Sequence, residues 1–339
     1  MQNRADLISD VLRVVQLSGA IFFEVNARAP WISEAPRSSE LLPLVMPEAQ
    51  GLIEYHVMLQ GEGWAEIVSE AGACERVRLE AGSVIIFPHG DAHRMGSDLA
   101  LESAPDLGHF APPDPTITLP FKLEVGEGTG NSEGTCAELI CGFLGHSSKP
   151  FNPLLEALPR ILHVRPRERR HDKPDDRLLE LIQAAVEESH CQRIGSSAVL
   201  SRLCELIFIA AVRRYVEDLP ENASGWLAAV RTPGIGKALA LIHSHPARDW
   251  TLEQLAREAG MSRSVMAERF NAVVGTPPMT YLSRWRMQLA AKLMETGSLP
   301  LRAVAESVGY ETEASFSRGF KRIVGMSPGQ WRRRTRHRQ

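Results

Sequence analysis

Short apolar runs separated by turn-forming residues predict β-structure in the N-terminal part of the chain. The runs lie at 20–25, 54–59, 64–68, 83–87 and 137–144. Gly61-Glu62-Gly63 stands between two of them and predicts a hairpin turn. Five prolines between 105 and 120 exclude a helix there and indicate a loop. We therefore expect a small β-sandwich or barrel.

Apolar residues spaced three or four apart predict helices in the middle of the chain, at 176–191 and 197–218. A charged linker at 165–176 precedes them, and the stretch 219–233, with two prolines and a glycine, predicts a flexible join. The second helix carries an apolar stripe that ends in an arginine. Its residues are Val199, Leu203, Leu206, Ile207, Ala210, Ala211 and Arg214. Two alternatives are open for this stripe: packing on the chain's own β-domain, or a helix-pair dimer interface.

The last hundred or so residues contain one helical pattern twice. A small residue and a glycine form a tight turn, a phenylalanine follows, and Gly-x-x-Pro ends the unit. Gly260 and Phe270 mark the first copy, and Gly309 and Phe320 mark the second, with offsets of 49 and 50 residues. Such a duplicated two-helix unit is typical of helix-turn-helix DNA binding, and two units in tandem predict contact with two successive major grooves.

Capping residues predict where the helices of this region begin. Thr251, followed by Gln254, is a capping box, and Ser262 and Thr312 can each begin a recognition helix. Between the two units, a proline at 277–278 begins a helix of roughly 20 residues, which spans about 30 Å at 1.5 Å per residue. One turn of DNA measures about 34 Å, so this helix can hold both units on the same face of a duplex.

Polar and projecting side chains on these helices are the candidates for DNA contact. Arg263 can present a bidentate fork to guanine, Met266 can touch thymine methyl groups, and Glu313 can accept from cytosine. Arg318 and Lys321 can bind guanine or phosphate, and phosphate or solvent is the alternative for every arginine. The complete predicted set is Ser262, Arg263, Met266, Arg269, Arg284, Arg286, Glu313, Ser315, Ser317, Arg318 and Lys321.

Charge divides the chain near the start of this helical region. The whole chain has 38 basic and 41 acidic residues, a net charge of −3. Residues 231–339 contain 18 Lys and Arg against 8 Asp and Glu, which leaves 20 against 33 for residues 1–230. The net charge is therefore +10 in the C-terminal region and −13 in the rest, and a basic module of this kind indicates phosphate binding.

Length and composition set the remaining bounds. A chain of 339 residues with 44% hydrophobic content can form two or three domains. The sequence begins with no signal peptide and has no apolar run near the roughly 20 residues of a membrane span, so we expect a cytoplasmic protein without a membrane partner. Five cysteines without a CxxC pair indicate neither a disulfide framework nor a zinc ribbon.

The stretch 82–93, in which Gly, Pro and Gly precede His93, resembles the second motif of the cupin β-barrel. The first cupin motif survives only in part. Glu54 has the expected glycine seven residues later, but the preceding His-x-His pair is absent, and His56 follows Glu54 on the same strand face. We therefore expect Glu54, His56 and His93 to converge inside the barrel and to bind the effector.

Three roles are open for this polar cluster. A histidine or carboxylate inside a barrel often only bonds to its neighbours or lines a ligand cavity. His56 and His93, with Cys141 or His146 as a further ligand, could instead bind a divalent metal such as zinc. Catalysis is the third alternative, although cupin oxygenases use the upstream histidines that this chain lacks. Cys141 shares a strand face with Leu139 and Phe143 and is expected to be a core residue, with a redox-responsive thiol as the alternative.

A longer signature lies at 309–328, with Gly-Tyr-Glu, then Phe-Ser-Arg-x-Phe-Lys-Arg, then Gly-Met-Ser-Pro. Related elements at 250–256 and 261–264 extend the match over about 232–334. This pattern resembles the AraC/XylS family of bacterial transcription regulators, and the elements at 141–159 resemble the cupin sensor domain of one branch of that family. The resemblance implies promoter DNA and RNA polymerase as partners, effector sensing by the cupin domain, and often a homodimer.

These features predict an α+β multidomain protein. Residues 1–164 are expected to form a cupin-like effector-sensing β-barrel, 165–230 a helical linker and dimerisation region, and 231–339 an all-α domain with two helix-turn-helix units. We expect a sequence-specific transcription regulator, an activator controlled by a small molecule, a metal or an oxidant, and no enzyme. The alternatives are a cupin oxygenase or isomerase fused to a DNA-binding module, and an architectural DNA-binding protein whose barrel serves only for assembly.

Overall fold

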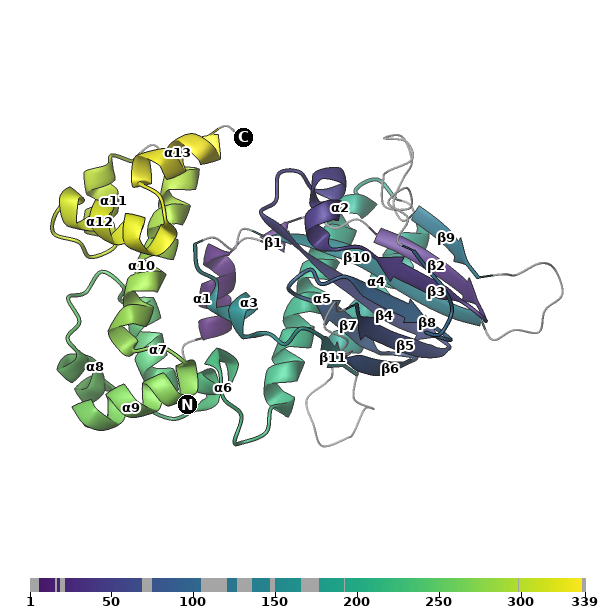
Figure 1. Ribbon diagram of the computed structural model, residues 1–339, viewed down its shortest axis with the longest axis horizontal. Helices are drawn as coiled ribbons and strands as arrows, with labels where there is room; N and C mark the ends of the chain where they lie inside the picture. Colours follow the sequence, from purple (N-terminus) through teal and green to yellow (C-terminus); the bar gives the residue numbers. More distant parts are fainter. Residues whose placement is uncertain are drawn as a thin grey trace. The chain divides into compact units, whose positions relative to one another are not determined.

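In the computed structural model, segments far apart in the sequence join to form each of two units (Figure 1). The helical unit contains Met1–Gln16, Ser148–Leu158 and Leu219–Gln339, and the β-unit contains Leu17–Ser147 and Pro159–Asp218. The expected division, by contrast, has three consecutive ranges. The structure describes residues 6–15, 17–18, 22–68, 75–104, 121–126, 136–146, 150–165, 177–191, 193–297 and 299–336. The predicted loop at 105–120 and all but the first residue of the predicted linker at 165–176 lie outside the described residues.

Each apolar run predicted as a strand overlaps a strand of the β-unit, and the described strands form two sheets. The larger sheet has the order β11-β7-β4-β10-β2-β9 with β1 paired to β10, and the smaller has the order β3-β8-β5-β6. The larger sheet consists of β1 (Leu17–Ser18), β2 (Phe22–Arg28), β4 (Gly51–Gln60), β7 (Val84–Phe87), β9 (Phe121–Val125), β10 (Cys136–His146) and β11 (Leu162–Val164). The smaller consists of β3 (Ile32–Ala35), β5 (Glu62–Ile67), β6 (Arg76–Glu80) and β8 (His93–Gly96). Among the described strands, no pairing closes the two sheets into one barrel.

The hairpin predicted at Gly61 is wrong, because the chain changes sheets there. β4 belongs to the larger sheet and β5 to the smaller. Gly61 has a φ of +83°, and a Cβ on it would lie 2.7 Å from the carbonyl oxygen of Cys136. Glycine therefore serves both the left-handed turn and the close approach to β10.

β4 is buried along most of its length on both faces. Side chains alternate between the faces of a strand, so Leu52 and Met58 enter the core that the two sheets share. Tyr55 lies on the opposite face, where its hydroxyl shares a hydrogen bond of 2.7 Å with Cys204 Sγ of helix α5. Helix α5 thereby covers the outer face of the larger sheet.

The helices of the β-unit are α2 (Ser38–Val45), which the sequence analysis missed, and the two predicted ones, α4 (Arg177–Cys191) and α5 (Ser196–Asp218). The predicted stripe on α5 divides between two faces. Ile207 and Ala211 are buried, whereas Val199 and Leu206 are each 45% exposed. Packing of α5 on its own unit is therefore confirmed, and a second apolar face of the helix is left exposed.

The tandem pattern in the C-terminal region is confirmed as two helix-turn-helix units, α8–α9 and α11–α12, joined by the long helix α10 (Figure 1). The helical unit consists of α1 (Leu7–Val14), α3 (Pro153–Ala157), α6 (Trp226–Arg231), α7 (Ile235–Ser244), α8 (Leu252–Ala259), α9 (Arg263–Val274), α10 (Pro278–Thr296), α11 (Leu301–Ser307), α12 (Glu313–Val324) and α13 (Pro328–Arg336). Helix α10 has 19 residues and is therefore about 28 Å long.

Two helices from distant parts of the chain pack against these units, since α1 contacts α7 and α10 and α3 contacts α6. Helix α6 lies in the stretch predicted as a flexible join, and that prediction is wrong. Trp226 is only 3% exposed, and its Nε1–H donates to the Tyr281 hydroxyl at 2.7 Å. Burial of this indole and the apolar residues after it stabilises a short helix where prolines and glycine suggested a linker. Within the described residues, every helix is too short or too polar to cross a membrane.

Candidate functional site

The first recognition helix, α9, presents a polar face that contains part of the predicted DNA-contact set. Ser262 caps the helix, and its Oγ accepts a hydrogen bond from the Val265 N–H at 3.3 Å. Arg263 and Arg269 are exposed. Arg263 Nε lies 2.6 Å from Glu253 Oε1, but both side chains are more than half exposed. The ion pair is therefore weak, and a phosphate or a base can replace it.

Met266 is a correction, because it is completely buried and cannot touch thymine methyl groups. Met266 and Phe270 are four residues apart and face the core together, where the Phe270 ring packs edge-on against Tyr281 at 5.9 Å between centroids. Val265, the neighbour of Met266, is 39% exposed and shares a face with Arg269. Val265 is thus a large apolar side chain on the exposed face of α9.

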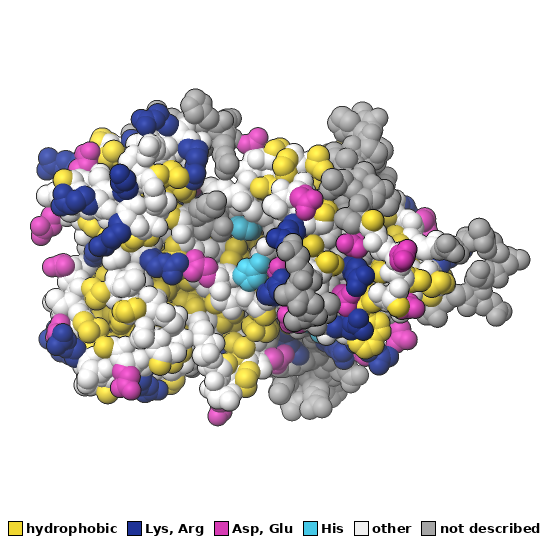
Figure 2. Space-filling view, in the orientation of Figure 1, with side chains coloured by type: hydrophobic (Ala, Val, Ile, Leu, Met, Phe, Trp, Pro, Cys, Tyr) yellow, Lys and Arg dark blue, Asp and Glu magenta, His cyan; other side chains and the backbone are white. Residues whose placement is uncertain are grey.

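The second recognition helix, α12, keeps most of its predicted surface. Thr312 caps it, because its Oγ1 accepts a hydrogen bond from the Ser315 N–H at 3.1 Å. Phe316 and Phe320 are fully buried. The exposed members of the predicted set on α12 are Glu313, Arg318 and Lys321, and the half-buried ones are Ser315 and Ser317. Lys and Arg side chains gather over α11 to α13 in the space-filling view (Figure 2).

Arg284, a predicted DNA contact, instead contacts other residues of the helical unit. Its Nη2 donates to both carboxylate oxygens of Glu156, at 3.0 and 2.9 Å. Its guanidinium carbon lies 3.9 Å from the centre of the Phe151 ring. The structure therefore corrects its predicted role: Arg284 binds α3 and the residues before it.

Arg286 is corrected in the same way, because its donors bind backbone carbonyls. Nε donates to Pro246 O at 2.7 Å and Nη2 donates to Arg248 O at 2.8 Å. The guanidinium carbon lies 5.7 Å from the centre of the Tyr310 ring in the second helix-turn-helix unit. Arg286 thus connects the loop before the first unit to the turn of the second.

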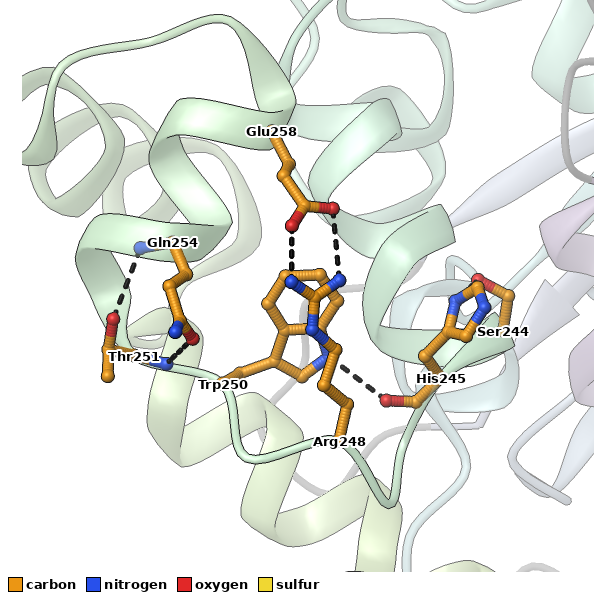
Figure 3. Close-up of polar contacts among 7 residues, drawn as sticks. All are labelled: Ser244, His245, Arg248, Trp250, Thr251, Gln254 and Glu258. Carbon is orange, nitrogen blue, oxygen red and sulfur yellow. Dashed lines mark hydrogen bonds and ion pairs between the residues drawn. The ribbon is translucent and has the colours of Figure 1, made fainter.

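Contacts among neighbouring residues hold the loop before the first helix-turn-helix unit in place (Figure 3). Trp250 Nε1–H donates to the His245 carbonyl oxygen at 3.0 Å, and the Arg248 guanidinium carbon lies 4.0 Å above the Trp250 ring. The predicted capping box follows at once. Thr251 Oγ1 accepts from the Gln254 N–H at 3.1 Å, and Gln254 Oε1 accepts from the Thr251 N–H at 3.0 Å. The first helix-turn-helix unit therefore begins at a fixed position.

The β-unit contains a cavity of about 140 Å³ that both sheets line. Most of its walls are apolar or aromatic. The buried polar side chains come from β4, β8 and β10, and more exposed ones come from β3 and β9. The apolar walls include Phe23, Val25, Trp31, Met95, Leu139 and Phe143, and the polar groups include Glu54, His56, His93 and Cys141. The structure thus brings together the three residues that the sequence analysis assigned to the effector.

These three side chains form a buried polar group, in which a hydrogen bond joins the two histidines. His56 Nε2 lies 2.9 Å from His93 Nε2, and His93 Nδ1 lies 3.0 Å from the Asp91 carbonyl oxygen. Glu54 Oε1 accepts a hydrogen bond from Ser38 Oγ at 2.7 Å, and Glu54 Oε2 lies 4.0 Å from His93 Nε2. Asp91 and Ser38 were absent from the sequence prediction. Asp91 occupies an unspecified position of the 82–93 motif and contributes only its backbone carbonyl oxygen, and Ser38 lies outside both cupin motifs.

Burial keeps the group uncharged near pH 7. It raises the pKa of Glu54 to about 8 against an ordinary value of 4.5, and the hydrogen bond from Ser38 only partly opposes this shift. Burial lowers the pKa of His93 to about 4, and burial and the neighbouring His93 hold the pKa of His56 well below 6.5. The cavity therefore contains a carboxylic acid and two neutral imidazoles.

The predicted metal site does not form. The described residues contain no group of three His, Cys, Asp or Glu side chains that could hold a metal ion. Cys141 lines the cavity, but burial and the nearby Glu54 raise the pKa of its thiol, which disfavours the thiolate that zinc requires. His146 lies five residues along the same strand, so it faces the other side of the sheet and is absent from the cavity lining. This donor set does not fit zinc.

Glu54→Gln should remove a pH-dependent loss of stability. The folded state binds the Glu54 proton more tightly than the unfolded chain does, so the stability that it provides is lost as the pH rises towards the folded pKa of about 8. Relative to the variant, the wild type should lose about 1.4 kcal/mol in its free energy of unfolding per pH unit between about pH 5 and 8. His56 and His93 face the same carboxyl, but both proteins contain them, so their titration cancels. Denaturant unfolding of the two proteins at several pH values checks this, and a constant difference would contradict it.

The two arrangements described above define a class: a DNA-binding regulator with a separate cavity-containing domain. A family model described as a cupin matches residues 6–217, and one described as a helix-turn-helix domain matches residues 255–334. The chain is 38% identical over 330 residues to an AraC-like transcription regulator of Streptomyces antibioticus, covering 97% of this chain and 98% of that protein. The chain belongs to this family of AraC-like, cupin-containing transcription regulators, and it is therefore a DNA-binding regulator and not an enzyme.

Two further transcription regulators agree with this assignment. The RCS-specific transcriptional activator RclR of Escherichia coli is 30% identical over 287 residues, which cover 84% of this chain and 86% of that protein. The regulator AlkR of Acinetobacter baylyi is 30% identical over 290 residues, covering 85% of this chain and 90% of that protein. The DNA-binding domain of AdpA, solved in complex with a target DNA, is 28% identical, with a TM-score of 0.30 and coverage of 32% of this chain and 96% of that one.

Proposed function

We propose that this protein binds promoter DNA through α9 and α12 and activates transcription when an effector occupies the cavity of the β-unit. The DNA side rests on the two exposed recognition faces and on the net charge of +10 in residues 231–339. After correction, the proposed DNA contacts are Ser262, Arg263, Val265, Arg269, Glu313, Ser315, Ser317, Arg318 and Lys321.

Selection of bound duplexes from a random DNA pool tests the DNA side. Because α10, which is about 28 Å long, joins the two units, we expect two short preferred sequences separated by about one helical turn, or 10 base pairs. Purified full-length protein should enrich such paired sequences. Enrichment of a single block, or of none, would contradict reading by both units.

One observation carries the proposal of effector control: the segment 150–158, between strands β10 and β11, packs inside the helical unit. The Phe151 N–H donates to Gln288 Oε1 at 2.9 Å, and both groups are buried. The Phe151 ring also packs edge-on against Tyr281 at 5.5 Å between centroids. Together with the pair between Glu156 and Arg284, these contacts fix the segment to the middle of α10, the helix that joins the two DNA-reading units.

The same segment follows strand β10 in the sequence, and β10 forms part of the cavity wall. Strand β10, which ends shortly before it, contributes Cys141 and Phe143 to the cavity lining. Strand β11, which follows it, pairs with β7. A ligand that shifts β10 can therefore change the position of the segment and, through it, bias α10. This is a short covalent route from the cavity to the DNA-reading helices.

Arg284→Ala and Glu156→Gln should have the same phenotype, because each removes one side of a single ion pair. Both should change the affinity for operator DNA without effector by about fivefold at most, since a half-exposed pair contributes only about 0.2 to 1 kcal/mol. Both should reduce the effector-dependent change in transcription. Operator titrations and a promoter reporter measure the two effects. If Arg284→Ala alone weakened binding to all sequences and lowered the salt dependence, Arg284 would be a phosphate contact instead.

We further propose that the protein acts as a homodimer in the cytoplasm and recruits RNA polymerase. The exposed apolar face of α5, with Val199 and Leu206, supports the dimer, because such a stripe on a helix pair is suited to self-association. Sedimentation of the full chain would show the dimer. Transcription with purified polymerase tests the activator role, and a decrease on addition of the protein would make it a repressor.

A further inference from the structure

The two recognition helices have the same geometry, so their residues can be compared position by position. Helices α9 and α12 have 12 residues each, and an offset of 50 residues relates them. The offset also holds at the capping residues Ser262 and Thr312 and at the left-handed glycines that end the helices, Gly275 and Gly325. A side chain of α9 therefore points in the same direction, relative to its own unit, as the side chain 50 residues later.

Glu268 of α9 and Arg318 of α12 occupy the equivalent position that faces furthest from the core. Each lies two residues after one buried core residue and two residues before another, which in α9 are Met266 and Phe270 and in α12 the two buried phenylalanines. Two residues correspond to about 200° around a helix, so Glu268 lies on the side opposite the core. Both side chains are exposed. The face that would enter a major groove thus has a carboxylate in the first unit and a guanidinium in the second.

The charge difference extends over the outward face of each helix, which consists of four exposed residues. In α9 these are Ser264, Glu268, Asn271 and Ala272. In α12, 50 residues later, they are Ala314, Arg318, Lys321 and Arg322. One Glu gives the outward face of α9 a charge of −1, whereas two Arg and one Lys give that of α12 a charge of +3. The outward face of α12 is therefore suited to phosphate attraction, and that of α9 is not.

The Glu268 carboxylate is not neutralised by its neighbours. Uncharged residues stand three and four positions away on either side, so no ion pair can form along the helix. Arg263 pairs with Glu253 instead. Arg269, the next residue, points about 100° away around the helix. Among the described residues, the Glu268 side chain has no hydrogen bond or ion pair, so its oxygens are available to a donor from a ligand.

DNA can offer such a donor only on its bases. Phosphates repel a carboxylate, so Glu268 opposes binding unless a base edge compensates for that repulsion. In the major groove, guanine and thymine present acceptors, and adenine presents its N6 amino group beside the N7 acceptor. Cytosine presents only the N4 amino donor. A carboxylate only accepts hydrogen bonds, so cytosine is the base that fits it best.

We propose that Glu268 determines the sequence preference of the first unit by accepting a hydrogen bond from cytosine N4. This assignment rests on the proposed function, in which α9 enters a major groove. Because Arg318 has the equivalent place in α12, the two units recognise different DNA sequences even though they are a duplication.

Binding of the full-length wild type, Glu268→Gln and Glu268→Arg to the operator obtained by duplex selection, and to its single-base variants, tests the assignment. The wild type should bind at least about fivefold more weakly when one particular cytosine is replaced. Glu268→Gln should prefer adenine at that position and Glu268→Arg should prefer guanine, because these side chains form bidentate pairs with those bases. Glu268→Gln should also bind an unrelated duplex more tightly than the wild type does, because the repulsion from phosphates is removed.

Glu221→Gln is the matched control. Glu221 is exposed and belongs to the same unit, but it lies before α6 and outside both helix-turn-helix units. This variant should leave the base preference unchanged. If Glu268→Gln and Glu268→Arg kept the wild-type preference at every position, or lost affinity equally for all duplexes, the assignment would be overturned. Two selected sequences that are identical would also overturn it. A wild type without base preference in either sequence would overturn the proposed function as well.

Discussion

Raising the salt concentration from about 50 to 200 mM should weaken binding of the full chain to its operator by about a thousandfold. Two recognition helices and their flanking arginines can neutralise roughly six phosphates, and each neutralised phosphate contributes about −0.9 to the slope of log affinity against log salt. The net charge of +10 in residues 231–339 supplies the cations for these contacts. Fluorescence anisotropy of a labelled operator over a salt series measures the slope.

Arg318→Ala separates base reading from phosphate binding within this result. As a base contact, Arg318 should contribute about 1 to 3 kcal/mol on the operator, and its loss should relax preference at one position with the salt slope unchanged. As a phosphate contact, its loss should weaken all sequences equally and reduce the slope by about one. Arg78→Ala on β6 is the matched control, since the Arg78 side chain is 54% exposed and belongs to the β-unit. A salt slope near zero would mean that the charge asymmetry has nothing to do with DNA.

The DNA-reading module could be predicted in detail because its signals are local. The capping box at Thr251, the cap at Thr312 and the glycine turns each act within four residues, and the structure has each where the sequence indicated. Local signals could not show which side of α9 faces the core. Val265 and Met266 are adjacent and both apolar, so the sequence alone could not decide which one faces the core formed with Tyr281.

The cavity of the β-unit could be predicted only in part. The signals available were the cupin motif and the alternation of side chains between the two faces of a strand. Those two signals brought Glu54, His56 and His93 together correctly. The same alternation along β10 places Cys141 and His146 on opposite faces, so it already argues against His146 as a ligand beside Cys141. The packing of the segment 150–158 on α10 joins residues 128 positions apart, as in the pair of Glu156 and Arg284. No local pattern contains such a contact.

Gly309→Ala should destabilise the helical unit far more than Gly260→Ala, although both glycines occupy the same place in the two helix-turn-helix turns. Both have left-handed backbones, with φ of +81° and +77°, so alanine costs about 1 to 2 kcal/mol at either position. A Cβ on Gly260 would meet nothing within 4 Å. A Cβ on Gly309 would lie 2.6 Å from the carbonyl oxygen of Ala247 and 2.8 Å from Arg286 Nη2.

The extra contact at Gly309 is with backbone and cannot be relieved by rotating a side chain. Arg286 is itself held by the carbonyls of Pro246 and Arg248, so the loop and the turn would have to separate. We expect this overpacking to add about 1 to 3 kcal/mol to the loss in free energy of unfolding. It should also weaken operator binding, because the second unit would move relative to the first. Denaturant unfolding and operator titration of both variants measure the two effects, and equal losses for Gly260→Ala and Gly309→Ala would show that the two turns are packed alike.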